Sequence, residues 1–175
     1  MHGQKSFNGV GILSKLPLEE VTRGLPGDDE DEQARWIEAT VVGEHEAVRL
    51  CGLYLPNGNP VPGPKYDYKL AWMARMQSRA EALLAEEMPF LMAGDYNIIP
   101  QAEDAARPEA WREDALFRLE SREAGAWNRN DGIRIDHFLM SPAVADMLTD
   151  AGIDRDVRGR EKPSDHVPVW VELAA

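Results

Sequence analysis

The chain has 175 residues, of which 43% are hydrophobic, and carries a formal net charge of −12. A chain of this length can bury roughly 70% of its unfolded surface, so we expect a single domain over residues 1–175. The charge argues against a protein that coats nucleic acid through bulk electrostatics, although it does not exclude an enzyme that acts on nucleic acid. The single cysteine, Cys51, excludes an internal disulfide.

The sequence has no uninterrupted apolar stretch of membrane-spanning length. The first ten residues also lack the apolar core of a signal peptide. We therefore expect a cytoplasmic protein with no membrane partner, and we expect a monomer.

Strand-like runs alternate with helical segments along the chain. The clearest helix is expected over 66–87, where apolar residues recur near helical spacing before Pro89. Pro142 opens a shorter expected helix that includes Leu148 and ends before Gly152. This mixture of strands and helices predicts a layered α/β or α+β fold. The expected strands are 10–13, 36–42, 48–55, 90–93, 135–140 and 167–173.

A polar motif follows the buried run 90–93. Asp95 and Asn97 alternate with Tyr96, so their side chains point to the same side if the strand geometry continues. A carboxylate and an amide oxygen in that position can hold Mg²⁺, a water or a phosphate. The alternative is ordinary turn chemistry, since Asp and Asn also favour loops.

A second polar motif precedes the last strand-like run, where His166 follows Asp165. Asp136 stands at the start of another strand. An imidazole held by a carboxylate keeps a defined tautomer, and it can orient or activate a water or stabilise a developing phosphorane. The alternative is a structural histidine. The segment 155–162, directly upstream, holds four basic residues against two acidic ones.

Two further segments carry weaker signals. Tyr54 ends a strand and Asn57 lies in the turn-rich loop after it, so a phenol and an amide can donate hydrogen bonds to phosphate oxygens. Trp127, beside Arg129 and Asn130, could stack on a base or fill the gap left by a missing one. Packing against the sheet is the alternative for both aromatic residues.

Taken together, these segments closely resemble the exodeoxyribonuclease III family of DNA repair nucleases, which include AP endonucleases, within the endonuclease/exonuclease/phosphatase superfamily. The resemblance runs over nearly the whole chain. It implies a β-sandwich flanked by helices, and an enzyme dependent on Mg²⁺ or Mn²⁺. Such an enzyme cuts duplex DNA 5′ to abasic sites and removes nucleotides from 3′ ends. The matching segments are 2–5, 8–10, 26–30, 54–58, 94–98, 126–130, 134–137 and 162–166.

The resemblance also implies a role for each polar residue. Asp95 would orient or deprotonate the attacking water, and His166, with Asp136 behind it, would act on the scissile phosphate. Asn97 and Tyr54 would stabilise the transition state. The implied metal ligands are Asp95, Asn97, Asp165 and His166, and the implied DNA-contacting residues are Asn57, Trp127, Arg129 and Asn130.

The chain departs from the family pattern in two places. Family members have an N-terminal strand that ends in Asn and a later Gln-Glu-Thr-like motif whose Glu is a principal metal ligand. Here the segment 2–5 follows directly after Met1, so neither ligand is assigned to a residue of this chain. The second departure lies between Phe117 and Gly125, where the family has a longer helical region and a Phe-Trp-x-Tyr string. We therefore expect a partial domain that lacks the N-terminal segment.

Three functions stay open from the sequence. The first is a metal-dependent DNA repair nuclease, and the second is a non-catalytic or weakly active truncated remnant of that family. The third is a superfamily member that acts on phospholipid or inositol phosphates, which the segments 26–30 and 126–130 make a weaker alternative.

Overall fold

The computed structural model of the protein describes residues 1–44, 46–123 and 134–174. The helices are α1 (Pro64–Ala85), α2 (Leu119–Glu123) and α3 (Pro142–Asp146), with the short 3₁₀ helices η1 (Ala102–Asp104), η2 (Pro108–Trp111) and η3 (Arg155–Gly159). The strands are β1 (His2–Gly3), β2 (Gly9–Val10), β3 (Leu18–Arg23), β4 (Trp36–Val42), β5 (Ala47–Tyr54), β6 (Phe90–Asp95), β7 (Asp136–Met140), β8 (Leu148–Ile153) and β9 (Val169–Leu173).

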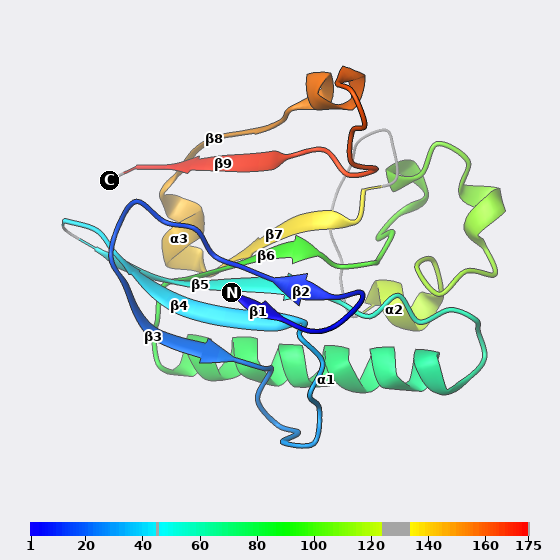
Figure 1. Cartoon of the computed structure of the whole chain (residues 1–175), viewed down its shortest axis with the longest axis horizontal. Helices are drawn as coiled ribbons and strands as arrows, with labels where there is room; N and C mark the ends of the chain where they lie inside the picture. The colour runs from blue at the N-terminus through cyan, green and yellow to red at the C-terminus, as the bar shows by residue number, and fades with distance from the viewer. Residues whose placement is uncertain (45, 124–133, 175) are drawn as a thin grey trace.

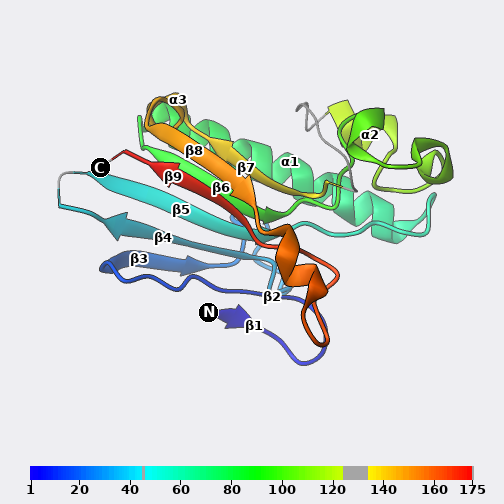
Figure 2. The ribbon, with the colours of Figure 1, turned by 90° about the horizontal axis from the view of Figure 1, so that it is seen from above.

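A five-stranded sheet with the order β3-β4-β5-β6-β7 forms the middle layer of the molecule. Helix α1 covers one face of this sheet, and the antiparallel pair β8 and β9 lies over the other face (Figures 1 and 2). The small pair β1 and β2 packs beside β4 and β5. This mixed α/β arrangement, in which a five-stranded sheet lies between a helix and a second, two-stranded sheet, confirms the predicted fold class. None of the described helices is long and apolar enough to cross a membrane.

Strands β5 and β6 are parallel neighbours in the middle sheet, and helix α1 connects them. A parallel pair needs a crossover of this kind because its strands begin at the same end of the sheet. Gly94 allows β6 to approach β5, since a Cβ at this position would lie 1.9 Å from the carbonyl oxygen of Leu53. Its φ of +150° is also rare for residues with a side chain. The end of β6 therefore depends on a glycine directly before Asp95.

The main core lies between α1 and the sheet. Trp36 of β4 and Trp72 of α1 meet edge to face, with ring centroids 6.1 Å apart. Cys51 is a fully buried free thiol in this core. Apolar side chains of β4, β5, β6 and α1 form one cluster, which includes Leu53, Met73, Met76, Leu83, Phe90 and Met92, together with Leu55 directly after β5.

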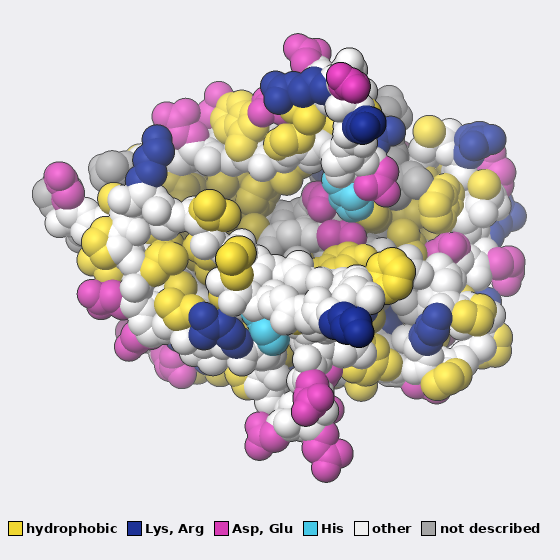
Figure 3. All heavy atoms as spheres, viewed as in Figure 1, with side chains coloured by type: hydrophobic (Ala, Val, Ile, Leu, Met, Phe, Trp, Pro, Cys, Tyr) yellow, Lys and Arg dark blue, Asp and Glu magenta, His cyan; other side chains and the backbone are white. Residues whose placement is uncertain are grey.

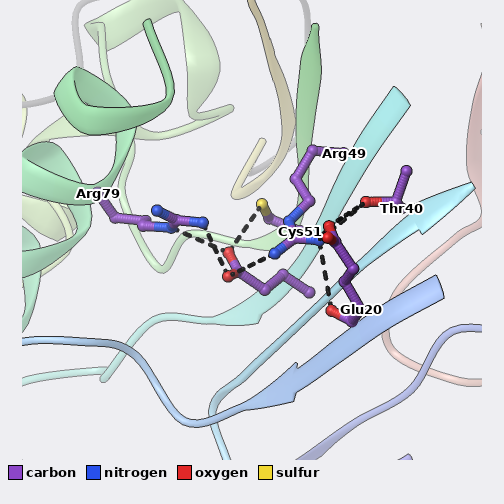
Figure 4. A network of polar contacts seen from close by, with 6 residues as sticks. Glu20, Thr40, Arg49, Cys51 and Arg79 are labelled. Carbon is purple, nitrogen blue, oxygen red and sulfur yellow. Dashed lines mark hydrogen bonds and ion pairs between the residues drawn. The ribbon is translucent and has the colours of Figure 1, made fainter. Parts of the chain in front are cut away.

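A buried network of charges also lies between α1 and the sheet (Figure 4). Glu38 of β4 accepts hydrogen bonds from Arg79 of α1, at 2.9 and 3.1 Å, and from Arg49 of β5, at 3.3 Å. Arg49 also donates to Thr40 at 2.8 Å and to Glu20 of β3 at 3.1 Å. The network joins three strands to the helix through a carboxylate that is only 2% exposed.

The strand predictions hold for most of the middle sheet and fail at its margins. The strand expected over 10–13 is limited to β2, and β3 was not predicted. The helix expected after Pro142 ends at Asp146, and Leu148 begins β8 instead of completing the helical face. Pairing with β9 explains this correction, since Gly152 lies opposite Trp170 and a Cβ there would come within 2.5 Å of the indole ring.

An apolar groove of about 640 Å³ separates part of the middle sheet from β8 and β9. It lies on the face opposite α1, where Figure 3 shows yellow apolar side chains beneath β9. Its apolar lining comes from Leu16, Val41, Val48, Leu50, Leu91, Met147 and Leu173.

Candidate active site

Three strand ends meet in one row on the face of the middle sheet opposite α1. Tyr54 at the end of β5 pairs in register with Asp95 at the end of β6, and Asp95 pairs with Asp136 at the start of β7. Partners in register project from the same face of a sheet. That face is turned away from α1, because Cys51 and Leu53, which alternate with Tyr54, lie in the core under the helix.

The side chains of Asp95 and Asn97 meet through a turn. Strand β6 ends at Asp95, and Asn97 has a left-handed φ of +47°. One carboxylate oxygen of Asp95 accepts the backbone N–H of Asn97 at 2.7 Å, and the other accepts its Nδ2 at 3.1 Å. The strand geometry assumed from the sequence does not continue, yet the turn still brings the two side chains together. Turn chemistry and a shared site are therefore compatible here.

The turn before β9 brings His166 to this row. Its Nδ1 lies 2.6 Å from Oδ2 of Asp136, and its Nε2 lies 4.0 Å from Oδ2 of Asp95. The hydroxyl oxygen of Ser164 accepts the backbone N–H of His166 at 3.1 Å, which stabilises the turn. The imidazole thus lies between carboxylates from two neighbouring strands, and Asp136 orients it.

Burial and charge shift the protonation of these groups. Burial, together with the charge of Asp136, raises the pKa of Asp95 to about 6, against the lowering effect of the Asn97 backbone N–H. Burial lowers the pKa of His166, but the hydrogen bond and the charge of Asp136 outweigh it and raise the pKa above the ordinary value. The surroundings therefore favour a protonated imidazole beside the two carboxylates.

Asn57 lies next to Asn97, although 40 residues separate them. Its Nδ2 donates to Oδ1 of Asn97 at 3.1 Å, and its own Oδ1 accepts from Nδ2 of Asn59 at 2.9 Å. Nδ2 of Asn97 in turn donates to Asp95 and, at 2.9 Å, to the carbonyl of Leu55. These hydrogen bonds fix the orientation of Asn57, the predicted phosphate contact, relative to Asn97, which is predicted to stabilise the transition state.

Tyr54 packs against Arg35 and also lies beside Asp95 in the candidate site. The guanidinium of Arg35 lies over its ring, 5.0 Å from the ring centroid. The backbone N–H of Tyr54 donates to the carbonyl of Arg35 at 2.9 Å. The register places the same residue beside Asp95.

Asp165 is exposed in the turn directly before His166, where its charge raises the pKa of that histidine. Its backbone carbonyl accepts a hydrogen bond from Arg158 of η3, which also donates to the carbonyl of Ser164 at 3.2 Å. In Figure 3, a histidine and several acidic side chains lie close together below a group of Lys and Arg side chains. Three predicted DNA-contacting residues, Trp127, Arg129 and Asn130, lie outside the described residues.

The donors at the site suit a metal ion that keeps most of its water. Within 1–44, 46–123 and 134–174, no group of three or more His, Cys, Asp or Glu side chains is arranged to hold a metal ion. Mg²⁺, however, is commonly bound through one or two carboxylates together with waters and substrate phosphates. Asp95 offers such a carboxylate, so the residues fit an ion bound by few protein ligands. The other predicted ligands, Asn97, Asp165 and His166, remain predictions.

Sequence reasoning missed the polar residues that support the site from behind. Lys69 of α1, which is 0% exposed, contacts the loops that carry Asn57 and Asn97. Its signal was present, since Lys69 falls in the apolar stripe of α1 between Tyr66 and Trp72. Asn59 also supports the site, since its Nδ2 donates to Asn57 and to Asp114. The sequence does not single out Asn59 or Asp114, because polar residues are common in loops.

Comparison with known proteins shows the family of the chain. The profile of the endonuclease/exonuclease/phosphatase family matches residues 1–166. Exodeoxyribonuclease III of Haemophilus influenzae is 32% identical over 98% of this chain and 79% of its own length. An exodeoxyribonuclease of Bacillus subtilis is 28% identical over 95% of this chain and 74% of its own length. The DNA repair nuclease APEX1 of Danio rerio is 26% identical, and the match spans 62% of that protein.

Solved structures give the same result. A Neisseria 3′ phosphatase bound to a product DNA hairpin superposes with a TM-score of 0.82 and 31% identity over 93% of this chain and 73% of its own. An AP endonuclease from Archaeoglobus fulgidus, with 24% identity, has a TM-score of 0.80 over 93% of this chain and 73% of its own and supports the fold. The chain therefore belongs to the exodeoxyribonuclease III and AP endonuclease family of the endonuclease/exonuclease/phosphatase superfamily.

Proposed function

We propose that the chain is a metal-dependent DNA repair phosphodiesterase that cuts duplex DNA at abasic sites and at 3′ ends. The observation that carries the proposal is the placement of His166 between Asp136, at 2.6 Å, and Asp95, at 4.0 Å. The family assignment supports the reaction class, and the DNA hairpin bound to the Neisseria relative supports the substrate class.

The two separations assign different tasks to the two carboxylates. The 2.6 Å contact lets Asp136 accept a hydrogen bond from the Nδ1–H of His166, which orients the ring and leaves Nε2 as the free ring nitrogen. The 4.0 Å gap between Nε2 and Oδ2 of Asp95 is too long for a hydrogen bond, so Nε2 can donate to a third group. Oδ2 of Asp95 accepts one bond from Asn97 and keeps a lone pair for another donor. A phosphate oxygen at Nε2 and a water at Asp95 would satisfy these two atoms.

The hydrolysis then divides between these residues. Asp95 orients the water and accepts its proton while the water oxygen bonds to phosphorus. Protonated His166 donates a hydrogen bond from Nε2 to a phosphate oxygen, which stabilises the negative charge that develops there. The P–O3′ bond breaks, and the O3′ leaving group takes up a proton. Asn97 orients Asp95, since both hydrogens of its Nδ2 are donated, one to Asp95 and one to the carbonyl of Leu55. Asn57 uses one Nδ2 hydrogen on Oδ1 of Asn97, and its second can contact a neighbouring phosphate oxygen.

Asp95, Asn97 and Asp165 would hold Mg²⁺ or Mn²⁺ at this site, with His166 as a further predicted ligand. When bound, the ion supplies Lewis-acid stabilisation of the phosphate charge. Mg²⁺ prefers oxygen to imidazole nitrogen, which favours the phosphate-directed role for His166.

A duplex with one abasic-site analogue and a 5′ label on the damaged strand tests the proposal. With Mg²⁺ or Mn²⁺, the purified chain should produce a labelled strand ending 5′ to the lesion, which the activity at 3′ ends then shortens further, and EDTA should abolish all of these products. Asp95→Asn and His166→Ala should remove the activity. Asp67→Asn, an exposed carboxylate on α1, is the matched control and should retain it. An intact substrate at high concentrations of folded wild-type protein and metal would exclude the function.

A non-catalytic or weakly active relative is the second candidate. It is favoured by the lack, within the described ranges, of a cluster of three acidic, His or Cys side chains that could hold a metal ion. A Mg²⁺ titration of the cleavage rate separates the two candidates. A rate that saturates at millimolar Mg²⁺ supports a catalyst with a weakly bound ion, whereas a rate at the level of a His166→Ala control supports the non-catalytic relative.

A further inference from the structure

Lys69 lies beneath the candidate site, on the buried face of α1. Its Nζ donates to the backbone carbonyls of Asn97 at 2.6 Å, Asn57 at 3.2 Å and Ala115 at 3.4 Å. These carbonyls belong to three separate loops, which follow β5, β6 and η2. One side chain therefore links the two loops that carry the site amides to a third loop.

Burying an ammonium group is costly unless each N–H has an acceptor. Lys69 meets this requirement, since its three hydrogens match three carbonyl acceptors. The aliphatic part is equally constrained, because a Cβ on Gly58 would lie 2.7 Å from Cδ of Lys69. The loop after β5 therefore closes over the lysine through a glycine with a φ of +91°.

The shortest of the three bonds goes to the residue with the most demanding backbone. Asn97 holds a left-handed φ of +47°, and the carbonyl of this residue accepts the 2.6 Å bond from Lys69. The same conformation directs Nδ2 of Asn97 to Asp95 at 3.1 Å and lets Oδ1 accept from Asn57 at 3.1 Å. Without the lysine, the loops that carry Asn57 and Asn97 would lose this common contact, and the side chains of both residues would no longer be held in place.

We propose that Lys69 is a positioning residue, which holds the loops of Asn57 and Asn97 in the geometry that lets Asn97 orient Asp95 and lets Asn57 present its remaining amide N–H to the substrate phosphate. The inference rests on the proposed phosphodiesterase function. Lys69 does not touch the substrate in this proposal, because Asn57, Asn97 and Ala115 lie around its amino group. It acts through the two asparagines alone.

Lys69→Met tests the proposal, because methionine fills most of the same space but has no N–H donor. Ser121→Ala is the matched control. Ser121 is also 0% exposed and donates to the same carbonyl of Ala115, at 2.8 Å, but it does not reach the loops of Asn57 and Asn97. Both variants remove a buried donor, and only one of them releases the site loops.

The first readout is steady-state cleavage of the abasic duplex at a temperature where each variant is folded. Lys69→Met should lower kcat by about 10²-fold, as expected for misplaced site groups, and change KM by less than about threefold. Ser121→Ala should keep the wild-type kcat. An equal loss of kcat in both variants, or a loss confined to KM, overturns the proposal.

The second readout is independent of activity. The side-chain amide signals of Asn57 and Asn97 in ¹⁵N-resolved NMR spectra should shift or broaden in Lys69→Met and stay in place in Ser121→Ala. If Lys69→Met does not fold, the wild-type spectrum decides, since an ammonium with three buried acceptors should give a slowly exchanging ¹⁵N signal. Unchanged amide signals, or the lack of that ammonium signal, overturns the proposal. An inactive wild type with the expected amide shifts would instead refute the phosphodiesterase function alone.

Discussion

At His166, a single hydrogen bond decides which ring nitrogen is free to act. Asp136 contacts Nδ1 at 2.6 Å, which leaves Nε2 as the ring nitrogen that faces Asp95. Asp136 itself stands at the first residue of β7, where the ladder with β6 fixes its backbone. A rigid strand thus orients the ring of a histidine that lies in a turn.

Replacing Asp136 by Asn tests this division of tasks. The amide keeps the shape of the carboxylate but removes the charge that stabilises the imidazolium, so kcat should fall by about 10²- to 10⁴-fold. Abasic-site cleavage under saturating substrate measures the effect, and Asp67→Asn serves as the control for loss of an exposed acid. Retention of the wild-type kcat in Asp136→Asn would show that His166 works without its carboxylate partner.

Among the elements, the acidic segment 28–32 contains one residue, Asp31, that joins its loop to helix α1. The sequence suggests a solvated loop, and most of its acids are exposed, but Asp31 docks on α1. It forms an ion pair with Arg75 and accepts hydrogen bonds from Tyr68 at 3.0 Å. Burial raises the pKa of Asp31, but the bonds from Arg75, Gln33 and Tyr68 outweigh it and leave the pKa below the ordinary value.

The lowered pKa of Asp31 predicts a pH-dependent contribution to stability. The contribution is present above the pKa of the unfolded chain, about 3.9, and is lost as the pH falls through the lower pKa of the folded state. Asp31→Asn should therefore lower the free energy of unfolding at pH 7 and have progressively less effect below pH about 4. Urea unfolding of both proteins across this range measures the difference. A difference that is constant with pH would contradict the assignment.

The basic segment around η3 gives a prediction about DNA binding. Arg155 and Arg160 are exposed near the turn that carries His166, and phosphate contacts make binding depend on salt. Arg155→Gln with Arg160→Gln should weaken binding of undamaged and abasic duplexes alike and reduce the salt slope by about one for each arginine that binds a phosphate. Lys65→Gln, on the helix that covers the opposite face, should leave the slope unchanged. Equal slopes in all three proteins would place the DNA elsewhere.

The elements also show which parts of the molecule were predictable. The middle strands β4, β5, β6 and β7 were predicted because buried runs bounded by turn residues are a strong signal. Strand β3 was missed because its sequence, Leu18–Arg23, is mostly polar and exposed, as suits an edge. Strand β8 was mistaken for the end of a helix because Val144 and Leu148 have helical spacing, and its pairing with β9 is a long-range contact.

The candidate site divides in the same way. Polar residues at strand ends suggested Asp95, Asn97, Asp136 and His166, which the structure brings together, while their roles stay predictions. The distances between them, and the support from Lys69, depend on which loops meet in space. Sequence spacing carries no such information, since Asn57 and Asn97 are 40 residues apart.

For the whole molecule, the two faces of the middle sheet carry separate tasks. The face under α1 holds the apolar core and the buried charges of Glu38, Arg49 and Arg79. The opposite face holds the row of Tyr54 and the two aspartates. Because the residues of a strand alternate between faces, a substitution on one face can alter stability with little effect on the chemistry of the other.

Glu38→Gln tests this separation, because it removes the carboxylate that pairs with two arginines and leaves both of them buried. Loss of one partner of a buried ion pair costs about 3–5 kcal/mol of unfolding free energy, so the variant should be strongly destabilised in urea. Glu20→Gln breaks the outer link to Arg49, where the side chain of Glu20 is 70% exposed, and should cost about 0–1 kcal/mol. At a temperature where both variants are folded, each should cleave the abasic duplex at the wild-type kcat. A kcat loss in Glu38→Gln that persists in fully folded protein would show that the charge network reaches across the sheet to the site.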